Sequence, residues 1–304
     1  FFFDKMVPAG ESIPKRAEGD DDANKMCWSH APAESFQVRS LGYKTSQMKE
    51  PSGPAIYEMV AVDAYQSPKK VPHFAQYIDL PTDDGLGLPY NLVINLMVPR
   101  YAPNLVWSAA GDGESWCVVL YCRLTEDALD LLRKNEPSPA LKLWKAFVEA
   151  ERQEPMKKRL KCIVRAVNAD EVGFNTATRS LINKYNGKPF LVRTTSSFYG
   201  GPHYYEIDID IHNFGKTARI ALYSCSEVAT QVTFEYCVVI QGEEDDELPE
   251  QLLCSVRLDK LDPSKVPTIP FTPKPTPPAA PIPNSPKMPV VVDDKEVDPE
   301  KNDE

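Results

Sequence analysis

The sequence predicts an α+β fold in which a mostly antiparallel β-sheet packs against several amphipathic helices in a single domain. Three neighbouring segments carry this prediction. Residues 203–212 alternate between apolar and polar side chains, as a strand with two unlike faces does. Residues 215–230 place apolar side chains at helical spacing, and residues 231–240 read as a buried strand. Because the strand and the helix each have one apolar face, we expect the helix to pack on the sheet.

The N-terminal part of the chain supplies further strands. Residues 1–26 mix Phe, Pro, Gly and Asp without a period, so we expect an irregular N-terminal arm. Extended runs follow at residues 36–39 and 59–65. Residues 92–98 and 116–124 are apolar at nearly every position, which predicts strands that are covered on both faces.

Three helices are predicted in the middle of the chain. Thr125 is positioned to cap the first, and two acids follow it in the opening turn. Ser138 is positioned to cap the second, with Pro139 at the first helical position. A third helix is expected over residues 175–185, closed by Gly187.

The character of the sequence changes after Leu261. Prolines recur every few residues from 263 to 289, which excludes packed helices and central strands there, and an acidic terminus follows. We therefore expect a folded domain over residues 27–261 and a Pro-rich acidic tail over residues 262–304.

Several stretches of the sequence resemble the C-terminal domain of the plant enhanced-disease-resistance protein family. They are EIDIDI at 206–211 and VVIQG-acidic-LPEQLLCSVRLDKL at 238–261, with CWS, FQVRSLGY, MVAVDAY and NLVINLMVP upstream. The resemblance runs from about Cys27 to Asp259. It implies a domain that is often joined to StAR-related lipid-transfer and pleckstrin-homology domains, and hence a link to lipids. It transfers no site residues.

The charge distribution excludes some partners. The net charge is −10, but residues 290–304 carry seven acids and two lysines, and residues 243–250 carry six acids and no base. The remainder is close to neutral, so an anionic surface is not excluded as a partner. A dedicated nucleic-acid binder usually has a basic domain, so nucleic acid is not expected. The sequence predicts no cofactor.

The seven cysteines form no CxxC pair, which is typical of a reducing intracellular compartment, cytoplasmic or at a membrane surface. No apolar run approaches the roughly 18 residues that span a bilayer. The sequence starts without methionine, so a targeting segment could be missing from it.

An acidic row is the group that most resembles a chemical site. Glu206, Asp208, Asp210 and His212 fall on one face of the predicted strand, and Asp208, Asp210 and His212 could in principle hold a divalent metal. Metal sites usually draw ligands from several elements, however. We favour the alternative, a polar face that pairs with a basic neighbouring strand.

A basic run is the candidate for lipid headgroups. It comprises Lys157, Lys158, Arg159, Lys161 and Arg165. Such a cluster near a membrane attracts anionic lipids by about 1 kcal/mol per charge. The alternative is a solvated or salt-bridged strand face.

The tail offers a candidate for protein partners. Pro270, Pro273, Pro275 and Pro278 have the spacing that suits aromatic-lined grooves, and a semi-rigid spacer is the alternative.

Three functions remain open, in order of preference. The first is a noncatalytic lipid-binding or peripheral membrane module, which predicts an apolar pocket between sheet and helices with the basic run near its mouth. The second is a structural subunit that uses its arms to bind partners. The third is an enzyme, although the serines at 196 and 197 lie in no nucleophile elbow and no phosphate-binding loop is present.

Overall fold

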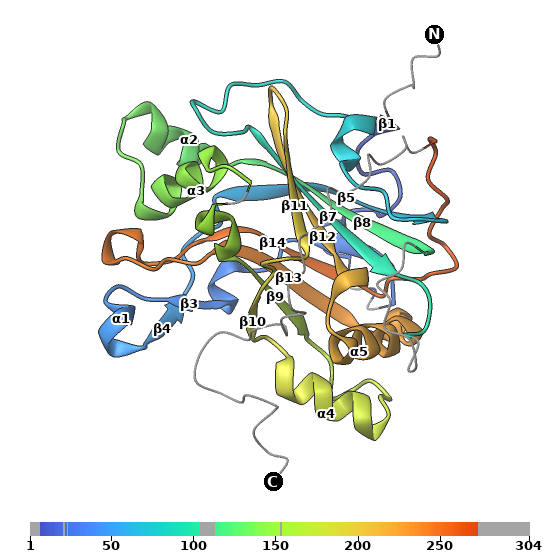
Figure 1. The fold of residues 1–304 in the computed structure, drawn as a ribbon. Helices are drawn as coiled ribbons and strands as arrows, with labels where there is room; N and C mark the ends of the chain where they lie inside the picture. The colour runs from blue at the N-terminus through green and yellow to red at the C-terminus, as the bar shows by residue number, and fades with distance from the viewer. Residues whose placement is uncertain (1–6, 21, 23, 104–112, 153, 273–304) are drawn as a thin grey trace.

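The computed structural model describes residues 7–20, 22, 24–103, 113–152 and 154–272. Within these ranges two five-stranded sheets share one hydrophobic core between their inner faces (Figure 1). The first sheet contains, in spatial order, β11 (Ser196–Gly200), β12 (Tyr204–Asp210), β7 (Asn91–Pro99), β8 (Ser115–Leu124) and β5 (Tyr57–Ser67). The second sheet contains β10 (Pro189–Leu191), β9 (Leu160–Ala166), β13 (Thr233–Ile240), β14 (Leu252–Asp259) and β2 (Cys27–Ser29).

The predicted α+β fold is confirmed, and its strands are mostly antiparallel. Within the two large sheets β12 and β7 run parallel, and the other strand pairs of the described residues are antiparallel. Two short ribbons complete the sheet structure: β1 (Val7–Pro8) with β6 (Ile78–Asp79), and β3 (Gln37–Arg39) with β4 (Lys49–Pro51). The strand pattern predicted one sheet, whereas the structure has two facing sheets.

Four of the five helices that the structure describes, α2 to α5, begin within one residue of where the sequence predicts, whereas the short helix α1 was not predicted. The five helices are α1 (Tyr43–Ser46), α2 (Glu126–Arg133), α3 (Pro139–Glu149), α4 (Thr176–Tyr185) and α5 (Lys216–Glu227). The Thr125 hydroxyl accepts a hydrogen bond from Ala128 N–H at the start of α2, and the Ser138 hydroxyl accepts one from Leu141 N–H at the start of α3. These caps satisfy backbone donors that have no partner inside the helix.

The main core lies between the sheets, and smaller clusters cover their outer faces. In β7, Leu92 and Ile94 belong to the inner core, whereas Val93 packs outward against the segment that contains Phe74. In the second sheet, Ile163 of β9 packs outward in the same way, in a cluster with Phe36. The prediction of strands covered on both faces is thus confirmed for β7 and β8.

The described part of the N-terminal arm packs on the domain. Ile13 is 1% exposed and forms a β-bridge with Val62 of β5. The buried Asp63 carboxylate accepts hydrogen bonds from the N–H groups of Gly10 and Ser12. Residues 7–20 of the arm thus contribute Ile13 to the core and pair with β5 of the first sheet.

The first residues of the predicted tail also pack on the domain. Gln66 N–H donates to the carbonyl of Pro267, and the Phe271 ring stacks on Tyr77 with centroids 4.1 Å apart. Pro270 therefore lies in a segment that is held against the first sheet, and its own side chain is exposed. Pro273, Pro275 and Pro278 lie outside the described residues.

Candidate functional site

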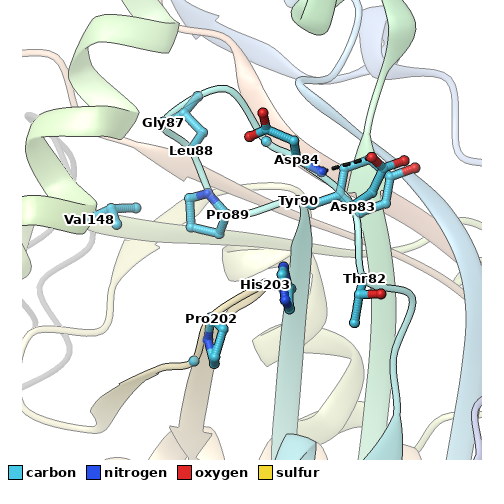
Figure 2. A pocket seen from close by; sticks show the side chains of 12 residues that line it. Thr82, Asp83, Asp84, Gly87, Leu88, Pro89, Tyr90, Val148, Pro202 and His203 are labelled. Atoms are coloured by element: carbon cyan, nitrogen blue, oxygen red, sulfur yellow. Dashed lines mark hydrogen bonds between the residues drawn. The ribbon is translucent and has the colours of Figure 1, made fainter.

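A surface depression lies where the loop at residues 82–90 meets the turn at residues 201–203 (Figure 2). Its two carboxylates are used to order the loop: Asp84 N–H donates to Asp83 Oδ1 at 2.7 Å, and Leu86 N–H donates to Asp84 Oδ1 at 2.8 Å. Such Asx-type turns are a structural role of aspartate. We therefore assign no chemical role to this depression.

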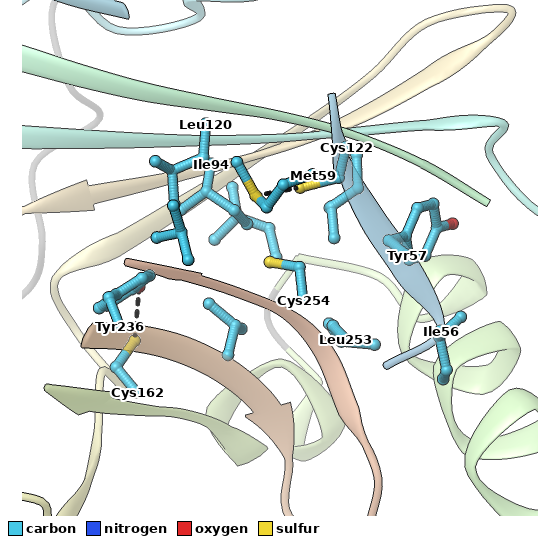
Figure 3. Packing of buried hydrophobic residues seen from close by; sticks show 14 of the residues in the cluster. Ile56, Tyr57, Met59, Ile94, Leu120, Cys122, Cys162, Tyr236, Leu253 and Cys254 are labelled. Atoms are coloured by element: carbon cyan, nitrogen blue, oxygen red, sulfur yellow. Dashed lines mark hydrogen bonds between the residues drawn. The ribbon is translucent and has the colours of Figure 1, made fainter. Parts of the chain in front are cut away.

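The inter-sheet core is filled at one end. Met59, Cys122 and Cys254 meet there between β5, β8 and β14 (Figure 3). The Tyr57 hydroxyl closes this end, because it accepts a hydrogen bond from Trp144 Nε1 at 2.9 Å and donates one to the Pro89 carbonyl at 2.7 Å. Both polar groups are thus satisfied within an apolar environment.

At its other end the inter-sheet core opens into a cavity of about 550 Å³. One wall comes from the first sheet and the opposite wall from the second, and α4 and α5 form the side. Its apolar lining includes Leu96, Val98, Trp116, Val118, Ile209, Cys162, Val164, Phe234, Tyr236, Leu258, Leu181 and Ile182. The pocket that the lipid-binding hypothesis required between sheet and helices is present.

The sequence of α5 explains why this space stays open. Its apolar stripe, predicted from helical spacing, consists mainly of small side chains: Ala218, Ala221, Leu222 and Cys225. Ala218, Ala221 and Leu222 are only partly buried although they face the interior, because they border the hollow rather than a packed neighbour. Small side chains on one wall leave room that the opposite sheet does not fill.

The cavity wall offers few polar atoms. The Tyr236 hydroxyl and Cys162 Sγ are 3.1 Å apart and partner each other (Figure 3). Burial raises the pKa of the Cys162 thiol to about 12 and that of the Cys225 thiol to about 11, so both remain protonated at neutral pH. The Nε1 atom of Trp116 is buried without a hydrogen-bond partner. This wall is suited to hold an apolar group rather than to attack one.

The acidic row lies on the face of the first sheet opposite to the cavity. Ile207 and Ile209 of β12 face the inner core, so Glu206 and Asp208 between them face outward, as the alternation predicts. Glu206 accepts hydrogen bonds from the N–H groups of Phe74 and Ala75, at 2.6 and 2.9 Å. Asp208 accepts one from His73 N–H and one from Asn95 Nδ2, both at 2.9 Å.

The structure corrects two details of this row. Asp210 ends the strand and is paired with Lys70, Nζ to Oδ2 at 2.8 Å, whereas His212 lies in a 3₁₀ turn and contacts the Tyr101 hydroxyl at 2.9 Å. The partners expected from the basic strand lie in the other sheet. Within the described ranges, no group of three His, Cys, Asp or Glu side chains could hold a metal ion.

The basic run is divided between buried and paired positions. Lys157 is 4% exposed and lies against the rings of Phe147, Phe198 and Tyr205. Lys161 is 3% exposed, and its Nζ binds both carboxylate oxygens of Glu250 at 2.7 and 2.8 Å. These two ammonium groups cannot reach a lipid headgroup, which corrects that part of the prediction.

The other three basic side chains are more accessible. Arg159 pairs with Glu247, Nη1 to Oε1 at 2.8 Å, and Arg165 pairs with Glu235. Lys158 is exposed. The part of the run that lies in β9 faces away from the cavity: the side chains of Cys162 and Val164 face the cavity, so those of Lys161 and Arg165 point to the opposite face of the sheet.

The charged residues in the cavity lining were not predicted as site residues from the sequence. Among the described lining residues they are Lys188, just before β10, and Lys216, the first residue of α5. Neither belongs to a charge run, so no local signal marked them. Only the fold places both lysines in the lining of one cavity.

Comparison with known proteins agrees with the resemblance seen in the sequence. A family model described as Protein ENHANCED DISEASE RESISTANCE 2, C-terminal, matches residues 28–262. The chain belongs to this family. The match includes most strands of both sheets together with α4 and α5, and every cavity-lining residue except Pro263 and Val266 lies within it.

A curated relative is named Protein ENHANCED DISEASE RESISTANCE 2-like, from Arabidopsis thaliana. It is 23% identical to this chain over 250 residues, which cover 80% of this chain and 30% of the relative. The chain thus spans 30% of the length of that member of the Enhanced Disease Resistance 2 family. No solved structure matches the chain. None of the helices that the structure describes is long and apolar enough to cross a membrane.

Proposed function

We propose that this domain is a noncatalytic lipid-binding module that holds one acyl chain in the cavity between its two sheets. The observation that carries the proposal is the cavity itself, about 550 Å³ with an almost wholly apolar lining. Small-ligand sites typically have volumes of roughly 300–1,000 Å³ and mostly apolar walls. Side chains that border an empty space lose dispersion contacts, so an alkyl chain that fills it restores them.

The position of the ionisable groups supports a role without chemistry. The two cavity thiols with raised pKa values are protonated at neutral pH and are therefore weak nucleophiles. Glu206 and Asp208, which have raised pKa values, lie on the opposite face of the first sheet, where backbone N–H groups surround them. Neither of these carboxyl groups faces the cavity.

A membrane surface is the physical source of acyl chains, and we include peripheral contact with one in the proposal. Of the five basic residues considered for headgroups, Lys158 keeps an exposed ammonium group. The seven cysteines are free and buried, which fits a reducing compartment.

Lipid binding is tested first by native mass spectrometry of the purified chain. We expect a bound species with the mass of a single-chain lipid, released on unfolding. A second measurement follows the displacement of a fluorescent fatty acid, with Trp116 in the cavity wall as an intrinsic reporter. A protein that carries no lipid and binds no probe would overturn the proposal.

A cavity-filling variant makes the test specific to this site. Ala221→Phe places a ring into the hollow from α5 and should abolish binding while leaving the fold stable, because the space is already present. Ala146→Phe, at an exposed position on α3, is the matched control and should bind like the wild type. Equal binding by both variants would place the lipid elsewhere.

A further inference from the structure

The segment that follows β14 passes from one face of the first sheet to the other. It comprises residues 261–271, near the red end of the ribbon in Figure 1, and runs beside β5, the strand at the edge of that sheet. Val266 belongs to the main core between the sheets, whereas Ile269 and Phe271 pack against the cluster on the outer face of the first sheet. The segment therefore wraps around one edge of the two-sheet sandwich.

The same segment forms part of the cavity wall, through Leu261, Pro263 and Val266. The other walls come from the two sheets and from α4 and α5, whose backbone groups are paired within helices and strand ladders. The segment itself forms no helix and only one isolated β-bridge. Its prolines at 263, 267 and 270 have no N–H to donate. It can therefore detach without breaking a helix or a ladder.

Gln66 of β5 holds the middle of this segment. Its backbone N–H donates to the Pro267 carbonyl at 2.7 Å, and its carbonyl accepts a hydrogen bond from Ile269 N–H at 3.0 Å. Its side-chain Nε2 donates to the carbonyls of Pro263 and Val266, at 3.1 and 2.7 Å. Within the described ranges, both backbone–backbone hydrogen bonds between the segment and the rest of the domain involve this one glutamine.

Phe271 holds the far end of the segment. Its ring stacks on Tyr77, with centroids 4.1 Å apart and planes 12° apart, and meets the Phe74 ring edge-on at 5.2 Å. Both partner rings belong to the 3₁₀ turn Phe74–Tyr77 on the outer face of the first sheet. Such aromatic pairs stabilise a contact beyond the area that they bury. The closed position of the segment thus depends chiefly on one glutamine and one aromatic ring.

We propose that residues 261–271 form a strap that opens to let the ligand into the cavity, with Phe271 as its latch. This inference rests on the proposed lipid-binding function and adds the route of entry to it. When the Phe271 ring leaves Phe74 and Tyr77, the strap moves off β5 and the space between the sheets opens at that edge. When the strap closes, Val266 and its neighbours complete the apolar wall around the alkyl chain and exclude water.

The test measures how fast a fluorescent fatty acid enters and leaves the whole chain in stopped-flow experiments. In Phe271→Ala and in Gln66→Ala both rate constants should rise, by about tenfold, because the contacts that favour the closed state are lost. The dissociation constant should change by less than about twofold, since an open state that stays minor hardly reduces the binding-competent fraction. Phe198→Ala, at a partly buried position on β11 at the opposite edge of the same sheet, is the matched control and should exchange like the wild type.

A cross-link provides the converse test. Gln66 and Thr268 are β-bridge partners. Partners on neighbouring strands lie roughly 5 Å apart, within reach of a disulfide. The double variant Gln66→Cys/Thr268→Cys should exchange the fatty acid more slowly than the wild type after oxidation with diamide, and dithiothreitol should restore the exchange.

The cavity thiols report opening without any lipid. Cys162 and Cys225 line the cavity, and the other five cysteines do not. N-ethylmaleimide should modify these two thiols faster in Phe271→Ala than in the wild type, whereas the other five should keep their wild-type rates. Mass spectrometry of the digested protein identifies the modified residues.

The outcomes separate the strap from the proposed function. Fatty-acid exchange and thiol labelling that ignore the latch variants and the cross-link would overturn the strap and leave lipid binding intact, because the ligand would then enter elsewhere. Faster labelling of Cys162 and Cys225 in a protein that binds no lipid would support the strap while overturning the proposed function. Equal acceleration by Phe198→Ala would show a general loosening of the domain and would also overturn this inference.

Discussion

Glu206 and Asp208 project from the same face of β12 into one buried region, where a single segment, His73 to Ala75, donates backbone hydrogen bonds to both carboxyl groups. Neither side chain is measurably exposed. Burial raises the pKa of Asp208 to about 6, and burial together with the neighbouring Asp208 raises the pKa of Glu206 well above its ordinary value. The pair therefore links the stability of the domain to pH.

Asp208→Asn should change how stability depends on pH between about pH 4 and pH 6. The raised pKa means that the folded state holds more protons than the unfolded state in this window, so the contribution of Asp208 is fully present below it and is lost as pH rises. The loss amounts to at most about 3 kcal/mol for a shift of this size. Urea unfolding at several pH values should show wild-type stability falling relative to Asp208→Asn as pH increases.

The control for this prediction is Asp127→Asn, because the Asp127 side chain is exposed in the first turn of α2. The stability of the wild type relative to Asp127→Asn should not fall as pH rises over this window. A constant difference between wild type and Asp208→Asn from pH 4 to pH 7 would contradict the assignment of a raised pKa to Asp208.

Lys157 should make the domain more stable as pH rises from about 8 toward 10.5. Burial lowers the pKa of its ammonium to about 8, so over this range the unfolded chain binds more protons than the folded one. Lys157→Met should remove this increase. Thermal unfolding at several pH values in this range measures the effect, with the exposed Lys158→Met as control. If stability depends on pH in the same way in both variants, the prediction for Lys157 is wrong.

Lys161→Met should destabilise the domain by about 3–5 kcal/mol, because it leaves a buried carboxylate without its main counter-ion. Glu250 is 2% exposed; besides Lys161, Arg39 Nε approaches its carboxylate at 3.9 Å and the backbone N–H groups of Arg39 and Gly242 donate to it. Lys158→Met removes a charge from the same run at an exposed position and should change stability by at most about 0.5 kcal/mol. Denaturant unfolding measures the loss of stability in each variant. Similar losses for Lys161→Met and Lys158→Met would contradict a structural role for Lys161.

Ile13→Ala should cost about 2–4 kcal/mol of stability, the usual loss for a buried aliphatic side chain. Ile13 belongs to the inner core although it lies in the N-terminal arm. Val60→Ala, at a position that is 39% exposed on β5, is the control and should have little effect. Unfolding midpoints in urea provide the comparison. A loss at Ile13 no greater than that at Val60 would show that the arm does not dock in solution.

Local features of this protein were predictable from its sequence. The caps at Thr125 and Ser138 depend on residues within one helical turn, and the outward face of Glu206 and Asp208 follows from strand alternation alone. The partners of those groups were not predictable. The donor to Glu206 at Phe74 is 132 residues away in sequence, and Lys161 finds Glu250 at a separation of 89.

The cavity illustrates the same limit. The stripe of Ala218, Ala221 and Cys225 predicts an inward-facing helix, but small side chains suit either a close contact or a hollow. Only the spacing of the two sheets, which is set by contacts between residues far apart in the sequence, decides between these cases. The places of Lys188 and Lys216 in the cavity lining could not be predicted for that reason, since neither lysine belongs to a charge run in the sequence.

The affinity of the cavity for fatty acids should rise with chain length and then level off. Each buried methylene contributes about 0.8 kcal/mol, so two more methylenes should increase affinity by roughly tenfold or more while space remains. Once the chain fills the hollow, further methylenes remain in water and add nothing. Displacement assays with saturated acids of increasing length measure this profile. A cavity made smaller by Ala218→Phe, from the same wall of α5, should reach its plateau at a shorter chain, whereas a profile that ignores the substitution would indicate binding outside the cavity.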